Sequence, residues 1–115
     1  MLIAYVAGPY NGDGHSEIDR HIQEARQVAI ELCRMGYATF TPHLNTAHFE
    51  VDAGLPEAFY KDMDIEFLGR SDLIVMLPTW EQSRGATAER NRAMGLSIPM
   101  FYWPADKSKL AEWVK

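Results

Sequence analysis

The stretch "LIVMLPTW" (residues 73–80) begins with five consecutive apolar residues and reaches a proline at position 78. A short run that is apolar on both faces is typical of a strand in a parallel sheet covered by helices on its two sides. Three other runs have the same character, and each is followed by a proline. They are "LIAYVAG", "YATF" and "IPMFYW", followed by Pro9, Pro42 and Pro104. Because proline cannot donate to a sheet ladder, these prolines mark strand ends.

Helical patterns alternate with the four runs. In residues 16–36, apolar side chains recur every three or four positions, with Ser16 as a candidate N-cap and Gly36 at the exit. Further helices are predicted for residues 56–70, from Ser83 onward, and for residues 107–114. This order predicts a single α/β domain over residues 1–115. We expect a small doubly wound, flavodoxin-like three-layer sandwich with a four- to five-stranded parallel sheet.

Composition limits the classes of partner. The 115 residues are 47% hydrophobic and carry 11 Lys and Arg against 16 Asp and Glu, a net charge of -5 without a basic cluster. We therefore expect no nucleic acid and no membrane surface as partner, whereas a single small nucleotide remains possible. No apolar run approaches the ~20 residues that span a bilayer, and the first ten residues lack the basic residues of a signal peptide. A cytoplasmic location is the expectation.

Few residues suggest a metal site. Cys33 is the single cysteine and is expected to be buried among apolar side chains. His43, Asn45 and His48 follow the second strand, but they lack a helical H-x-x-x-H spacing and a cysteine partner. We therefore expect no metal and no cofactor. His43 is kept as a candidate substrate contact, with a hydrogen-bonding loop residue as the alternative, while His15 and His21 are expected to be solvated.

The glycine-rich stretch "GPYNGDGH" (residues 8–15) matches neither the dinucleotide fingerprint nor the P-loop. It is either a flexible turn leading to Ser16 or a loop whose amides hold a phosphate or sugar.

Two carboxylates occupy positions that suit buried side chains. Glu89, in "SRGATAERNRAMG" (residues 83–95), is spaced four from Ala93 and seven from Leu96, which places it on the inward face of a helix. Asp64 falls on the apolar side of its helix, whereas Asp62 points away; the alternative is a surface acid paired with Lys61 or Arg70. Two carboxylates at one sheet edge suit cleavage of a glycosidic bond, in which one stabilises or attacks the anomeric carbon and the other handles protons.

Three segments together resemble the nucleoside 2-deoxyribosyltransferase superfamily, which includes the nucleoside 5'-monophosphate N-glycosidases. They are "YVAGPY" (residues 5–10), "DIEFLGRSDLIVML" (64–77) and "SRGATAERNRA" (83–93). The resemblance implies that Glu89 is the nucleophile at C1' of the sugar. It also implies that Asp64 manages the proton of the departing base and that Tyr5 holds Glu89 by a hydrogen bond.

The resemblance extends to the substrate-binding positions. It implies that Ser83 and Gly85 line the end of the pocket that receives a 5'-phosphate or 5'-hydroxyl, and that Gly8 lets the backbone approach the sugar. His43 matches a histidine near the pocket. Pro9 stands where the monophosphate hydrolases carry a phosphate-binding serine, so a preference for the 5'-phosphate stays open.

The implied function is cleavage of the N-glycosidic bond of a nucleoside or nucleoside 5'-monophosphate, by hydrolysis or by transfer to another base. A homodimer or larger oligomer is also implied, with Phe59, Trp80 and Trp103 as candidate exposed contacts. The alternative is a non-catalytic nucleotide-binding or sensing domain of the same fold. The joint presence of Tyr5, Asp64 and Glu89 favours the enzyme, because binding alone does not need paired acids.

Overall fold

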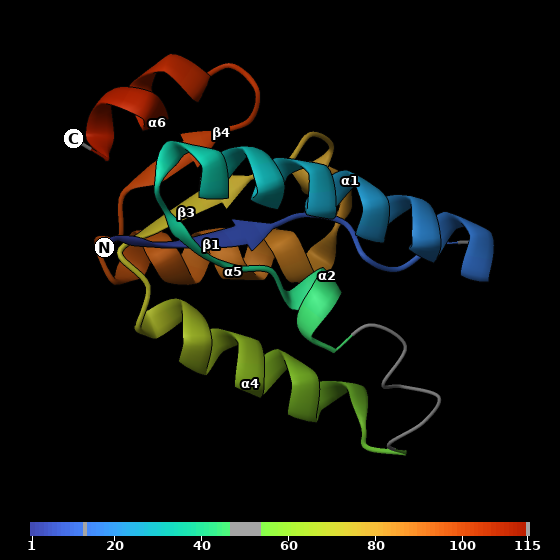
Figure 1. The fold of residues 1–115 in the computed structure, drawn as a ribbon. Helices are drawn as coiled ribbons and strands as arrows, with labels where there is room; N and C mark the ends of the chain where they lie inside the picture. The colour runs from blue at the N-terminus through green and yellow to red at the C-terminus, as the bar shows by residue number, and fades with distance from the viewer. Residues whose placement is uncertain (13, 47–53, 115) are drawn as a thin grey trace.

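The chain forms a four-stranded sheet in which all strands are parallel (Figure 1). The computed structural model describes residues 1–12, 14–46 and 54–114. The strand order is β2-β1-β3-β4. The strands are β1 (Ile3–Ala7), β2 (Ala38–Phe40), β3 (Leu73–Met76) and β4 (Met100–Tyr102). Each lies within one of the four apolar runs, so the predicted four-stranded parallel sheet is confirmed.

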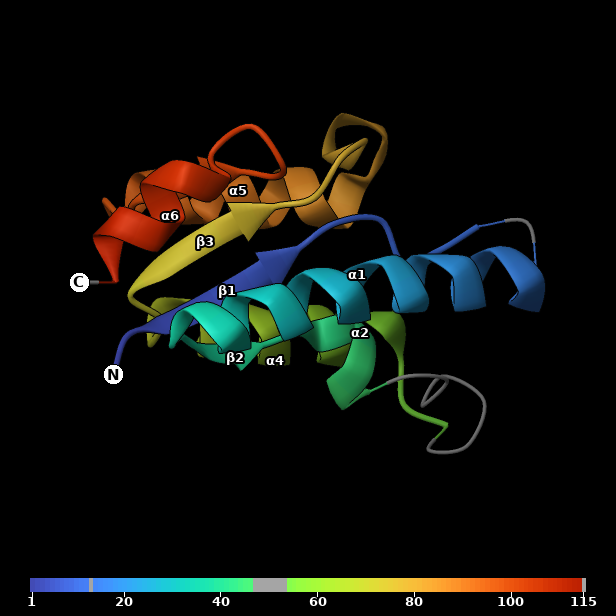
Figure 2. The same cartoon turned by 45° about the horizontal axis from the view of Figure 1, so that its top comes forward.

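Helices cover both faces of this sheet, which gives the predicted three layers (Figures 1 and 2). One face carries α1 (His15–Met35) and α6 (Lys107–Trp113), and the other carries α4 (Glu57–Gly69) and α5 (Arg84–Gly95). Two short elements follow strands: α2 (Pro42–Asn45) after β2, and the 3-10 turn η1 (Trp80–Gln82) after β3. None of the helices in the described ranges is long and apolar enough to cross a membrane.

Alternation along the central strands divides the core into two halves. Ala4 and Val6 of β1 belong to the cluster beneath α1 and α6, whereas Tyr5 and Ala7 belong to the cluster beneath α4 and α5. Successive strand residues point to opposite faces, so this division follows from the period of two. Tyr5 is therefore the polar residue that β1 presents to the two helices carrying Asp64 and Glu89.

The ends of α1 confirm one prediction and correct another. Gly36 adopts a left-handed conformation with φ 108° and ends the helix, as predicted. Ser16 is not the N-cap, because the helix already begins at His15 and the cap residue is Gly14, with φ 99°. Glycine reaches such a φ without steric cost, so it turns the chain into the helix two residues earlier than a cap at Ser16 would.

Several expectations about exposure were wrong. Cys33 is exposed, since it lies one position beyond the fully buried Leu32 and therefore on a different face of α1. Trp103 is buried rather than exposed. Leu96 is 42% exposed because α5 ends at Gly95, before the helical face could carry Leu96 inward. On α4 the buried residue is Leu68, while the neighbouring Phe67 is 41% exposed.

Candidate active site

Tyr5 and Glu89 meet at the face of the sheet that α4 and α5 cover. Tyr5 is fully buried in β1, and its hydroxyl donates a hydrogen bond to Glu89 Oε2. Glu89 lies in the second turn of α5, which begins where the Ser83 side chain accepts a hydrogen bond from the Ala86 amide at 3.1 Å. The predicted start of this helix at Ser83 is thereby confirmed, and the Ser83 cap fixes the rotation of the helix that turns Glu89 toward β1.

Asp64 approaches the same place from α4. Its side chain is partly buried, whereas Asp62 is exposed, as the helical spacing predicts. Lys61 and Arg70 pair with Glu57 at 3.4 Å and with Glu66 at 3.5 Å, so neither of the two suggested salt bridges to Asp64 forms. Asp64 Oδ1 is buried, and no hydrogen-bond partner for it exists among the described residues. A buried carboxyl oxygen without a partner is costly to the fold, which favours a role toward a ligand.

The three groups influence one another electrostatically. Burial raises the pKa of Glu89 to about 8; the hydrogen bond from Tyr5 opposes this rise, and the negative charge of Asp64 adds to it. Burial also raises the pKa of Asp64 to about 6. The pKa of the Tyr5 phenol is raised by burial and then by the charges of Glu89 and Asp64, so Tyr5 remains a hydrogen-bond donor. Two carboxyls whose pKa values straddle neutrality can exchange a proton with a substrate near pH 7.

A stack of aromatic rings holds Tyr5 from the side. The Tyr5 ring stacks on Phe40 of β2 with a centroid distance of 5.6 Å, and Phe40 stacks on Phe67 of α4 at 4.1 Å. Phe40 lies directly opposite Tyr5 in the register of the two strands. The stack links the strand that carries Tyr5 to the helix that carries Asp64. Phe40 is the last residue of the run "YATF", so its place at the end of a strand could be predicted from the sequence. Its contact with Tyr5 could not, because that contact depends on strand register.

The two glycines predicted to line the substrate site, Gly8 and Gly85, differ in whether their surroundings leave room for a side chain. A Cβ at Gly8 would lie 2.7 Å from both Cβ and Cδ1 of the buried Leu77, whereas a Cβ at Gly85 would meet only Ser83 Oγ, at 3.9 Å. Packing against Leu77, the residue that follows β3, therefore explains Gly8 without any ligand. Packing does not explain Gly85, where a side chain would fit.

Gly8→Ala should lower the free energy of unfolding by about 1 to 3 kcal/mol, because the new methyl group overlaps Leu77. Gly85→Ala is the matched control and should be neutral or stabilising by up to ~1 kcal/mol, since alanine favours a helix. Urea denaturation of the two variants measures the difference. Equal stability of both would contradict the close approach of Gly8 to Leu77.

His43 and Pro9 lie together at the exit of β1. His43 is 3% exposed, and its Nε2 lies 2.8 Å from the Pro9 carbonyl oxygen, while its buried Nδ1 has no partner among the described residues. Burial lowers the pKa of His43, so the ring is neutral and donates from Nε2. His43 thus makes the loop hydrogen bond that was the alternative to a substrate contact.

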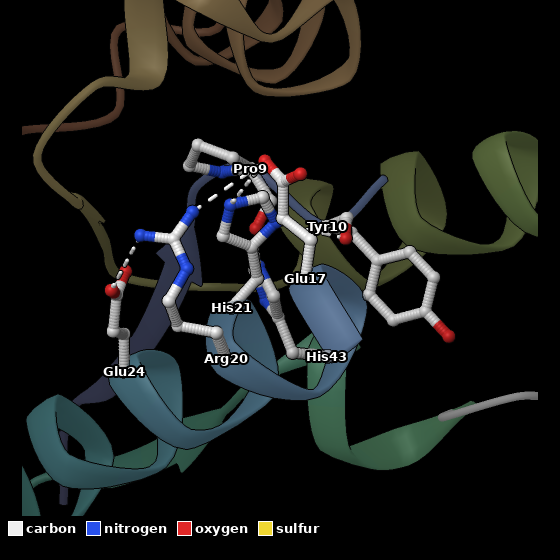
Figure 3. A network of polar contacts seen from close by, with 7 residues as sticks. All are labelled: Pro9, Tyr10, Glu17, Arg20, His21, Glu24 and His43. Carbon is white, nitrogen blue, oxygen red and sulfur yellow. Dashed lines mark hydrogen bonds and ion pairs between the residues drawn. The ribbon is translucent and has the colours of Figure 1, made fainter. Parts of the chain in front are cut away.

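His21 was expected to be solvated, and this was wrong. It is 8% exposed, and its Nδ1 lies 3.0 Å from the Tyr10 carbonyl oxygen (Figure 3). A sequence signal existed, because His21 precedes the buried Ala25 by four positions and Leu32 by eleven. It therefore belongs to the buried stripe of α1.

Other surface features lie outside the Tyr5–Asp64–Glu89 cluster. Ser83, Arg84, Thr87 and Asn91 line a shallow depression at the start of α5, and a second groove runs along the outer side of α4. Within the described ranges, no group of three His, Cys, Asp or Glu side chains could hold a metal ion. His48 falls outside these ranges.

Comparison with known proteins places this site in context. Residues 2–102 match the model of a family described as a domain of unknown function (DUF4406). No curated protein matches the chain. A solved structure of a 2-deoxyribosyltransferase from the psychrotolerant bacterium Bacillus psychrosaccharolyticus, described as a biocatalyst for the synthesis of antiviral and antitumoral nucleosides, superimposes with a TM-score of 0.62. The match has 24% sequence identity and covers 87% of this chain and 70% of that one.

That match confirms the resemblance to the deoxyribosyltransferases at the level of the fold. The family model spans the sheet from β1 to β4 and all three residues of the cluster. The chain therefore belongs to the DUF4406 family and has the α/β fold of a 2-deoxyribosyltransferase.

Proposed function

We propose that this protein cleaves the N-glycosidic bond of a nucleoside or nucleoside 5'-monophosphate, passing the sugar to water or to another base. The observation that carries the proposal is the hydrogen bond from the buried Tyr5 to Glu89, beside Asp64, whose buried Oδ1 has no hydrogen-bond partner among the described residues. A pair of buried acids, one held by a tyrosine and the other with a carboxyl oxygen free for a ligand, suits this reaction. The shared fold with a 2-deoxyribosyltransferase supports the same assignment.

The reaction would take two displacement steps at C1'. First, a carboxylate oxygen of Glu89 bonds to C1' while the bond from C1' to the base nitrogen breaks, and protonated Asp64 supplies the proton that the base takes away. Then water or a second base attacks C1', Asp64 takes the proton of the attacking group, and the ester to Glu89 breaks. Glu89 and Asp64 are thereby returned to their starting states.

The pKa of Asp64 and the hydrogen bond from Tyr5 support this division of roles, while burial, which raises the pKa of Glu89 to about 8, leaves only a fraction of Glu89 ionised at neutral pH. A carboxyl with a pKa of about 6 gives up and recovers a proton easily near neutral pH, which suits Asp64. Tyr5 would hold Glu89 in line for attack, and its hydrogen bond favours the ionised form that attacks.

The start of α5 would receive the 5' end of the sugar. Ser83 and Gly85 lie in its first turn, where backbone amides without helical partners favour an anion or hydroxyl oxygen. The room beside Gly85 is compatible with a ligand there. Pro9 has neither an N–H nor a hydroxyl to offer, so a preference for the phosphate would rest on Ser83 and its neighbouring amides.

The test is incubation of the purified protein with a panel of nucleosides and nucleoside 5'-monophosphates, with and without a second free base, followed by chromatography. Free base alone indicates hydrolysis, and a new nucleoside indicates transfer. If one panel member binds tightly and none is cleaved, the enzyme assignment fails and the sensing domain takes its place.

We also propose that the protein is a homodimer or larger oligomer. Phe59 and Phe67 of α4 are 48% and 41% exposed, and burying them against a second copy would be favourable. Light scattering at micromolar concentration should give at least twice the 13.1 kDa chain mass. A monomeric mass at that concentration would contradict the proposed oligomer.

A further inference from the structure

The loop that leaves β1 is held at three consecutive residues. Gly8 is buried against Leu77, with no room for a side chain. The next two residues are held through their carbonyl groups, Pro9 by His43 at 2.8 Å and Tyr10 by His21 at 3.0 Å. This loop directly follows the strand that carries Tyr5, at the carboxyl edge of the sheet, where ligands of open α/β sheets bind.

The two histidines reach the loop from separate helices. His21 belongs to α1 and His43 to α2, and Figure 3 shows both rings directed toward the Pro9 and Tyr10 segment. Both are more than nine-tenths buried, so they are built into the fold and are not mobile surface groups. The ring of Tyr10 also meets that of His43 edge to face, with a centroid distance of 5.9 Å.

An acidic residue faces His21 on its other side. Glu17 Oε1 lies 4.0 Å from His21 Nε2, and Arg20 lies near both Glu17 and Glu24, at 3.5 and 3.6 Å. Because the Tyr10 carbonyl only accepts hydrogen bonds, the His21 nitrogen that faces it must carry the proton.

Fixing a carbonyl also fixes the amide beside it. The peptide unit is planar, and its C=O and N–H point in opposite directions. When His43 sets the Pro9 carbonyl it therefore orients the Tyr10 N–H, and when His21 sets the Tyr10 carbonyl it orients the Asn11 N–H. Both amides are directed away from the histidines.

We propose that His21 and His43 are positioning residues, which hold the loop at residues 8–11 in the conformation that receives the sugar end of the substrate without touching the substrate themselves. This inference rests on the proposed nucleoside cleavage for its ligand. It assigns His21 a role beyond the paired acids and gives His43 an indirect role.

Paired variants separate the hydrogen bond from packing. His21→Leu and His43→Leu fill much of the space but remove the donor. His21→Asn places an amide N–H near the position of Nδ1, and His43→Gln places one near Nε2. Glu24→Gln is the control, since Glu24 is exposed on α1 and its ion pair with Arg20 does not reach the loop.

With a cleaved nucleoside as substrate, each leucine variant should raise KM about tenfold and keep kcat within about threefold, because one hydrogen bond contributes about 1 kcal/mol or slightly more. The asparagine and glutamine variants should restore KM to within about threefold of wild type. If all four variants lowered kcat and raised KM to the same extent, the histidines would have a general structural role, and the inference would be overturned.

Hydrogen exchange followed by mass spectrometry tests the loop without any substrate. Exchange of residues 8–12 should accelerate in the leucine variants and remain near wild type in His21→Asn, His43→Gln and the control. Unchanged exchange there, or acceleration along the whole of α1, would contradict the positioning role. If the leucine variants do not fold, His21→Asn and His43→Gln provide the test. Exchange protection and KM like those of the wild type would support the positioning role, and weaker protection or a raised KM would contradict it. If the wild type cleaves no nucleoside, the proposed function fails, while the exchange result still decides whether the histidines order the loop.

Discussion

Glu89→Gln should abolish turnover, with a loss of about 10⁴-fold or more, because no carboxylate remains to bond to C1'. The amide can still accept the hydrogen bond from Tyr5, so the local structure should persist. Glu66→Gln is the matched control, since Glu66 is an exposed glutamate paired with Arg70 on the surface of α4. Retention of a tenth or more of wild-type activity in Glu89→Gln would exclude Glu89 as the nucleophile.

The same substitution should increase stability at alkaline pH. The pKa of Glu89 is raised to about 8 in the folded state, so the folded protein holds a proton that the unfolded chain releases above about pH 4.3. The wild type should therefore lose stability as pH rises from 5 to 8, and glutamine, which does not titrate, should remove much of this loss. At pH 8 we expect Glu89→Gln to be more stable by up to about 4 kcal/mol, since a pKa raised from about 4.3 to about 8 corresponds to about 5 kcal/mol at about 1.4 kcal/mol per pKa unit, and the folded-state group is only half ionised at pH 8. Denaturant unfolding at pH 5, 6.5 and 8 measures this. A variant that unfolds at every pH would make Glu89 a structural residue.

Asp64→Asn should lower turnover by about 10² to 10⁴-fold while ligand affinity changes little, because asparagine keeps the shape of the side chain but transfers no proton. A sharper result comes from a synthetic deoxyribosyl substrate with a 4-nitrophenolate leaving group, which departs without a proton. On that substrate the Asp64→Asn defect in forming the glycosyl-enzyme should largely disappear, whereas the Glu89→Gln defect should persist. Equal defects of Asp64→Asn on both substrates would show that Asp64 does not protonate the base.

The pH profile should identify both acids. Attack requires ionised Glu89, and departure of the base requires protonated Asp64. Between the two pKa values the pair shares one proton, and the reactive form is the fraction that carries it on Asp64. In the wild type, kcat/KM should therefore rise through about pH 6 and fall above about pH 8, with both limbs belonging to the pair. In Asp64→Asn the alkaline fall should be lost. The remaining rise then reports the ionisation of Glu89 alone and should lie above pH 6 but below about pH 8, because the charge of Asp64 no longer adds to the burial that raises the pKa of Glu89. An alkaline limb that survives in this variant would have to belong to another group.

The fold could be predicted because its signals are local. Each strand is a short apolar run closed by a proline, and the four-residue spacing of α1 and its glycine exit are visible in the sequence. The inward position of Glu89 followed from the same periodicity once the start of α5 at Ser83 was correct. Such patterns depend on a few neighbouring residues, and no knowledge of the tertiary contacts was needed.

Features that depend on contacts between distant segments could not be predicted in this way. The stacking of Phe40 on Tyr5 depends on strand register, and the burial of Trp103 depends on how the chain turns after β4. His21 was misjudged because it was judged as a polar side chain, although histidine is intermediate in its tendency to be buried and its spacing placed it in the buried stripe. The loop carbonyl that satisfies it comes from Tyr10, eleven residues earlier in the chain.

The most direct test of the central claim is capture of the sugar on Glu89. A 2'-deoxy-2'-fluoro nucleoside should form the glycosyl ester but release it slowly, because the electronegative fluorine disfavours the positive charge that develops at the sugar in both steps. After incubation of the wild type, intact mass should increase by one fluorosugar unit, and peptide mapping should place the adduct on the segment that contains Glu89. No adduct should form on Glu89→Gln. An adduct on another residue, or active enzyme that turns over nucleosides with no adduct at all, would contradict the assignment of Glu89 as the nucleophile.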